Sequence, residues 1–209
     1  MSNNLVNINI NEKKSVIWAE IVLLFILPIT WFYLELAPRD WDLAVFEIFI
    51  VLLAVLAFGR RIGWRRLGFR WDNFRAAVKQ FLPGTAIIAA IMSVLYYFKV
   101  GTTYYFEGWW RNEYFIYYIL FGVLSQEFAF RGFLIDRLKQ AADNKWMIIV
   151  VAAVLFSLLH SLHHSSMLWL GAFSLGLFWA WAYLKQPNIY VVSISHAIIG
   201  SVAIILGFV

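Results

Sequence analysis

The sequence predicts an all-α membrane protein, a polytopic bundle of about seven transmembrane helices that forms one domain over residues 1–209. Of the 209 residues, 63% are hydrophobic and only 14% are charged, a larger apolar share than soluble domains have. The apolar residues gather into runs close to the roughly 20 residues that a helix needs to cross a bilayer. Aromatic residues, which favour the headgroup zone, flank these runs: Trp41, Trp64, Trp71, Trp109, Trp110, Trp146 and Tyr190.

The apolar runs predict seven spans, at about 16–36, 42–58, 80–98, 114–134, 146–162, 167–184 and 189–207. The segment before the first run is polar, rich in asparagine and unlike a cleavable signal peptide, so we expect the first run to remain as a span. In the sixth span, small residues recur every four positions and allow close approach of another helix: Ala172, Gly176 and Ala180.

Basic residues predict the orientation, because lysine and arginine accumulate in cytoplasmic loops. With the N-terminus in the cytoplasm, most of them fall on that side: Lys13, Lys14, Arg60, Arg61, Arg65, Arg66, Arg70, Arg75, Lys79, Arg137, Lys139, Lys145 and Lys185, against Arg39, Lys99 and Arg111 on the other. The basic loop 59–79 either only sets this topology or also lies on the membrane surface. We expect a multi-pass protein of a prokaryotic inner (plasma) membrane. The net charge of +5 does not indicate nucleic acid, because the basic residues lie in loops beside the spans.

The polar run from Ser125 to Gly132 interrupts the fourth span with a carboxamide, a carboxylate and a guanidinium. A charge inside a span costs roughly 2.5–3.5 kcal/mol, so such residues are rare and usually functional. Glu127 and Arg131 lie four residues apart on one helical face, where an ion pair lowers the cost of both charges. Gln126 is turned about 100° from Glu127 and faces a different neighbour.

Two histidines interrupt other spans. His160 shares a helical face with Phe156, and His196 shares one with Gly200. One such histidine alone is either a packing residue or a site residue, but two on helices that flank the polar run favour a site. As an alternative, the two imidazoles could be axial ligands of a haem or hold a metal, which leaves the polar run unexplained.

Several hydrolase chemistries lack their residues in this chain. It has no cysteine for a disulfide, a thiolate nucleophile or a thiolate metal site. It also has no His-Glu-x-x-His motif for zinc, no Gly-x-Ser-Gly turn and no pair of aspartates within the spans. We therefore expect neither a metal nor a cofactor.

Three short motifs resemble those of the CPBP family, the CAAX-protease and bacteriocin-processing intramembrane glutamic proteases. Gln126-Glu127-Phe128-Ala129-Phe130-Arg131-Gly132 corresponds to Glu-Glu-x-x-x-Arg-Gly, Phe156-Ser157-Leu158-Leu159-His160 to Phe-x-x-x-His, and His196-Ala197-Ile198-Ile199-Gly200 to a histidine usually followed four residues later by asparagine. Order and spacing match over about 120–200, within a motif-bearing core of about 114–207, and each motif lies on its own expected span.

The resemblance implies an endopeptidase in which water attacks a membrane-anchored peptide, such as a bacteriocin leader, a lipidated C-terminus or a sorting tail. Position 126 and His160 would activate the water, and His196 would stabilise the oxyanion. Glu127 and Arg131 would hold the motif together, with Phe156 and Gly200 at supporting positions. These roles suit amide hydrolysis, which needs a base near the water and donors aimed at the developing negative charge.

Two positions depart from the family's pattern. Gln126 replaces the glutamate base, and because a carboxamide cannot usefully accept a proton, the chain as written should be nearly inert. The glutamine is an engineered change in an active protease or belongs to an inactive member that binds a partner or confers immunity; otherwise Glu127 is the base. Gly200 replaces the usual asparagine, so an oxyanion donor is missing or a water fills its space. We expect a wet cavity that opens to the non-cytoplasmic side, with the fourth helix starting deeper, tilted or kinked.

Overall fold

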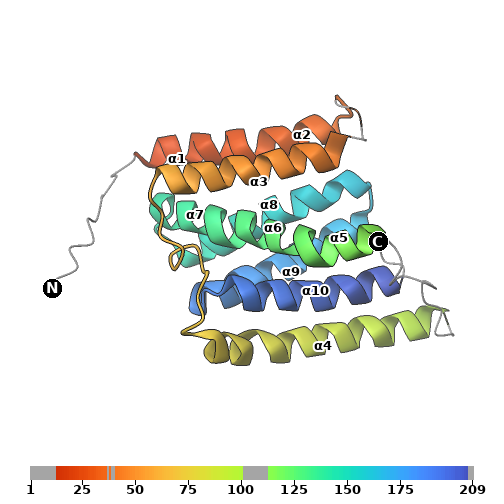
Figure 1. The fold of residues 1–209 in the computed structure, drawn as a ribbon. Helices are drawn as coiled ribbons and strands as arrows, with labels where there is room; N and C mark the ends of the chain where they lie inside the picture. The colour runs from red at the N-terminus through yellow and green to blue at the C-terminus, as the bar shows by residue number, and fades with distance from the viewer. Residues whose placement is uncertain (1–12, 37, 39–40, 101–112, 207–209) are drawn as a thin grey trace.

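The computed structural model describes residues 13–36, 38, 41–100 and 113–206, and in these ranges the chain folds into helices packed side by side (Figure 1). In chain order they are α1 Lys14–Ile21, η1 Val22–Ile26, α2 Leu27–Tyr33, α3 Asp42–Gly59, α4 Phe74–Val100, α5 Glu113–Tyr117, η4 Tyr118–Gly122, α6 Val123–Glu127, η5 Phe128–Leu134, α7 Ile135–Ala141, α8 Lys145–His160, η6 Ser161–His163, α9 Ser166–Lys185 and α10 Ile189–Ile205. Segments η1, η4 and η5 are π-helical, so α1 to α2 form one continuous first rod and α5 to α7 form the fourth. The predicted all-α bundle is confirmed.

The rods are apolar enough to make this a multi-pass membrane protein. Five are long enough to cross a bilayer: Lys14–Tyr33, Phe74–Phe98, Phe115–Ala141, Lys145–His163 and Ser166–Lys185. The shorter apolar helices Leu43–Gly59 and Ile189–Ile205 complete the seven predicted segments. The loop after α3 and the turns α7–α8 and α9–α10 lie at the same end of the bundle as the start of α1 (Figure 1). This is the end that the basic residues predict to be cytoplasmic.

Two boundaries differ from the prediction. Helix α4 begins at Phe74 rather than near 80, and the fourth rod continues to Ala141 rather than ending near 134. Arg137 and Lys139, expected in a loop, are therefore helical. The predictions that concern Arg39, Trp109, Trp110, Arg111 and the asparagine-rich segment fall outside the described residues.

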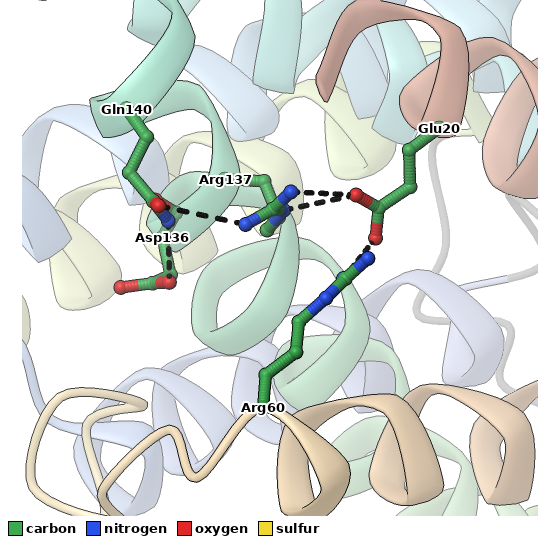
Figure 2. A network of polar contacts seen from close by, with 5 residues as sticks. All are labelled: Glu20, Arg60, Asp136, Arg137 and Gln140. Carbon is green, nitrogen blue, oxygen red and sulfur yellow. Dashed lines mark hydrogen bonds and ion pairs between the residues drawn. The ribbon is translucent and has the colours of Figure 1, made fainter. Parts of the chain in front are cut away.

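The last turns of the fourth rod stay helical and buried because their charges have partners (Figure 2). Arg137 is 2% exposed, and its Nη2 donates to Glu20 Oε2 at 2.7 Å. Glu20 also pairs with Arg60 from the end of α3. Asp136, itself buried, pairs with Arg66. This network ties α1, α7 and the loop after α3 together, and hydropathy alone could not have predicted it.

The loop between α3 and α4 is anchored to the bundle rather than lying free beside it. Leu67 is buried, and its carbonyl accepts a hydrogen bond from the Tyr183 hydroxyl at 2.8 Å. Gly68 follows with a φ of +89°, and a Cβ there would overlap the same hydroxyl, so glycine is required. Further along, the Arg70 guanidinium hydrogen-bonds to Asp72 and holds the pKa of that carboxyl below its ordinary value.

The fourth rod is the centre of the bundle. Every side chain from Glu127 to Leu138 is buried, whereas the outer rods present many exposed large apolar side chains, among them Leu23, Ile48, Val55, Phe58, Ile91 and Leu95. Lipid tails solvate such side chains, so exposed apolar faces are expected in a membrane. The polar run thus lies on the rod that is most enclosed by protein.

The small-residue stripe of α9 packs against α8. A Cβ at Gly176 would lie 2.9 Å from the Cα of Ala153, closer than real side chains approach. Gly176→Ala should therefore push the two helices apart and cost about 1–3 kcal/mol of stability. Gly171→Ala on the same helix is the matched control, because nothing lies within 4 Å of that Cβ position. Thermal unfolding in detergent should show a lower melting temperature for Gly176→Ala only; equal melting of the two variants would contradict the close packing.

Candidate active site

The centre of the candidate site is the carboxylate of Glu127, which is 0% exposed, beside Arg131, which is 1% exposed. Arg131 Nη1 donates to Glu127 Oε1 at 3.1 Å. His196 Nδ1 lies 2.7 Å from the same oxygen. Because an ionised carboxylate only accepts hydrogen bonds, we assign the proton to Nδ1 of His196, which donates it. Glu127 therefore forms the ion pair within its own rod and also joins that rod to α10.

Aromatic rings enclose this buried charge. The Arg131 guanidinium carbon lies 4.2 Å from the ring centre of Phe156 and 5.2 Å from that of Trp179, within the range of cation–π attraction. The Trp179 ring also packs on His196 with 4.5 Å between ring centres. Its indole nitrogen donates to Ser195 at 2.8 Å, which fixes the indole in place. Sequence reasoning missed Trp179, because one tryptophan among many in an apolar span has no distinguishing pattern.

The structure places Gln126 and His160 at the same level of the bundle. Helix α8 runs antiparallel to the fourth rod (Figure 1), and the rings of Phe130 and Phe156 meet with 5.4 Å between their centres. Gln126 lies about one turn before Phe130, and His160 lies about one turn after Phe156. On antiparallel helices these two offsets point the same way along the bundle, which puts positions 126 and 160 at about the same level.

The hydrogen bond of His160 uses Nδ1 and leaves Nε2 able to accept another hydrogen bond. Its Nδ1 lies 3.0 Å from the carbonyl oxygen of Phe156. A carbonyl only accepts, so Nδ1 carries the proton, and Nε2 of the neutral imidazole is an acceptor. An acceptor in this position can take a hydrogen bond from a water molecule.

Two acceptors of the polar run have no hydrogen-bond partner within the described part of the chain. They are Gln126 Oε1 and Glu127 Oε2, and both atoms are buried. Buried polar atoms in folded proteins nearly always have a partner. A water molecule or a polar group of a substrate is therefore expected to bind at this point.

At Gly200 a side chain from another rod occupies the space that a larger residue would need. A Cβ at Gly200 would overlap the Tyr118 hydroxyl, and the Tyr118 ring lies edge-on to His196 with 6.0 Å between centres. Sequence reasoning missed Tyr118. In a regular α-helix, positions 118 and 127 point about 180° apart, so nothing in the spacing links them.

The two histidines share a neighbour. Both imidazoles pack on the side chain of Phe156, with ring centres 4.6 Å and 5.7 Å away. Over the described ranges, no three His, Cys, Asp or Glu side chains come together in a group that could hold a metal ion. The polar groups that the structure does bring together are Glu127, Arg131 and His196.

The comparisons with known proteins point to the same segment. Residues 107–202 match the family model described as type II CAAX prenyl endopeptidase Rce1-like. The match covers somewhat less than half of the chain and includes every motif residue discussed above. No curated protein and no solved structure is similar enough to the chain to count as a match.

Proposed function

We propose that the chain is an intramembrane glutamic endopeptidase, on the premise that the segment that holds these motifs matches the Rce1-like family of type II CAAX prenyl endopeptidases. Its substrate is a membrane-anchored peptide or protein segment with a lipidated C-terminus. The observation that carries the proposal is that position 126 and His160 lie at the same level of the bundle, next to the Glu127–His196 hydrogen bond. This arrangement supplies acceptors for a water molecule and a hydrogen-bond donor in the same part of the bundle.

The proposed reaction is hydrolysis of one peptide bond. A carboxylate at position 126 takes a proton from a water held by Nε2 of His160, and the water oxygen adds to the scissile carbonyl carbon. The carbonyl oxygen becomes negative and accepts a hydrogen bond from His196. The proton then passes to the leaving nitrogen as the C–N bond breaks, which yields a carboxylate and an amine.

Glu127 prepares His196 for this role. Since Nδ1 of His196 already donates to Glu127, Nε2 must carry a second proton to donate to an oxyanion. A carboxylate bound to the opposite nitrogen stabilises such an imidazolium and holds its orientation. Arg131, held by its two aromatic neighbours, hydrogen-bonds to Glu127 and keeps that side chain in place.

The glutamine at position 126 leaves the chain as written without its base. Glu127 is the alternative base: its Oε1 accepts hydrogen bonds from both Arg131 and His196, and its Oε2 has no partner among the described residues. We infer that this form binds the peptide but hydrolyses it slowly. Gln126 is also the observation that favours the second candidate function, a membrane protein that binds a partner or confers immunity without hydrolysis.

The experiment that tests the proposal uses a fluorogenic CAAX peptide with a prenylated cysteine, presented in lipid vesicles. The Gln126→Glu variant should cleave it, and adding His160→Ala should lower kcat at least about 100-fold, because the water loses its second contact. His164→Ala is the control, since that residue lies half-exposed in the turn after η6. Cleavage that survives His160→Ala unchanged would contradict the assigned role. Absence of cleavage by Gln126→Glu would favour the non-hydrolytic function.

The proposed function includes an orientation of the bundle in the membrane. The end of the bundle with the α3–α4 loop faces the cytoplasm of a prokaryotic cell, and the site opens to the opposite side. His160 supports this, because it ends α8 at the opposite end of the bundle (Figure 1).

A further inference from the structure

We propose that the Tyr118 hydroxyl is a catalytic residue of this site, a second hydrogen-bond donor to the oxyanion beside His196. The inference rests on the proposed function and assigns a role to a residue outside the three motifs. Its starting point is the space beside Gly200, which lies four residues after His196 and hence on the same face of α10.

The hydroxyl fills the position from which a side chain at 200 would project. The atoms nearest to a Cβ built on Gly200 are the Tyr118 hydroxyl oxygen and two carbons of its ring. Glycine at 200 and tyrosine at 118 are therefore sterically coupled, because any side chain at 200 would displace the tyrosine ring. A donor is present where the resemblance places an asparagine, but it comes from the fourth rod.

The hydroxyl is also free to donate. Within the described ranges it makes no hydrogen bond, whereas the hydroxyl of the adjacent Tyr117 bonds to Glu47 Oε1 at 3.0 Å. The Tyr118 side chain is half-buried and lies within electrostatic range of Glu127. A phenol hydroxyl donates one hydrogen bond, and an oxyanion bound beside His196 would accept it.

The first test compares Tyr118→Phe with Tyr117→Phe, each combined with Gln126→Glu and assayed on the prenylated CAAX peptide in vesicles. Loss of one oxyanion donor typically lowers kcat by about 10²–10³, so Tyr118→Phe should show a loss of that size with KM little changed. Tyr117→Phe should keep kcat within about threefold. Equal kcat in the two variants, or a loss confined to KM, would overturn the proposal.

The second test exchanges the donor. Tyr118→Ala opens the space beside Gly200, and adding Gly200→Asn should recover at least about tenfold of the lost kcat, because an amide again points at the oxyanion. Gly200→Asn in the presence of Tyr118 should not help, since the two side chains collide. If Tyr118→Ala loses no kcat, the proposal is wrong; if Gln126→Glu itself cleaves nothing, the proposed function fails first.

Discussion

Gln126→Glu should convert a nearly inert chain into an active peptidase, with an increase in kcat of about 10²–10⁴, the usual contribution of a positioned general base. The two side chains differ by one atom type, so the packing around position 126 stays the same. Gln126 Oε1 is already buried without a partner among the described residues. A carboxylate placed there would gain the water proton as its partner, and KM should hardly change.

The comparison is made on one peptide in one lipid composition, and the rate of peptide-bond hydrolysis is measured for both forms. Gln126→Ala is the matched control, because it opens space without adding a base and should remain as slow as the chain with glutamine. A rate for the unaltered chain equal to that of Gln126→Glu would show that another group, Glu127 included, supplies the base.

Arg131→Met should be among the most destabilising substitutions in the molecule, with a loss of about 3–5 kcal/mol in the free energy of unfolding. The guanidinium is 1% exposed and its carboxylate partner 0% exposed. Removal of one member of a buried ion pair leaves the other charge uncompensated, and this dominates the cost. Chemical unfolding in detergent micelles measures the loss.

A double substitution separates charge from packing. Glu127→Gln combined with Arg131→Met removes both charges, so it should be less destabilising than Arg131→Met alone. Arg65→Met is the control for loss of an arginine, because the Arg65 side chain is 73% exposed. This substitution should change the free energy of unfolding by no more than about 0.5 kcal/mol. Equal losses for Arg131→Met and the double variant would show that Glu127 is not ionised or not coupled to Arg131.

Local spacing predicted much of the site, and contacts between rods account for the rest. The pairing of Glu127 with Arg131 follows from their four-residue separation on a helix. The hydrogen bond from His196 to Glu127 could not be predicted, because spacing along a chain does not show which rods touch. Hydropathy places Arg137 in a loop because it counts the charge of the side chain and not its partner, Glu20, which lies in the first rod.

Tyr118 shows a second limit of reasoning from helical periodicity. The regular spacing of an α-helix places it opposite Glu127, yet both side chains contact α10. The π-helical turn at Tyr118–Gly122 lies between them, and such turns alter the rotation along a helix and are frequent at functional sites. A sequence read with a fixed angle per residue cannot detect this change of face.

The carboxylate of Glu20 bears on how the protein is assembled during synthesis. It receives Arg60 as soon as the first two rods have entered the bilayer, but Arg137 arrives only with the fourth. In an unfinished chain, one oxygen of the Glu20 carboxylate therefore lacks its arginine partner until the motif-bearing rod has inserted. Glu20 thereby links the first two rods to the motif-bearing rod through a single side chain.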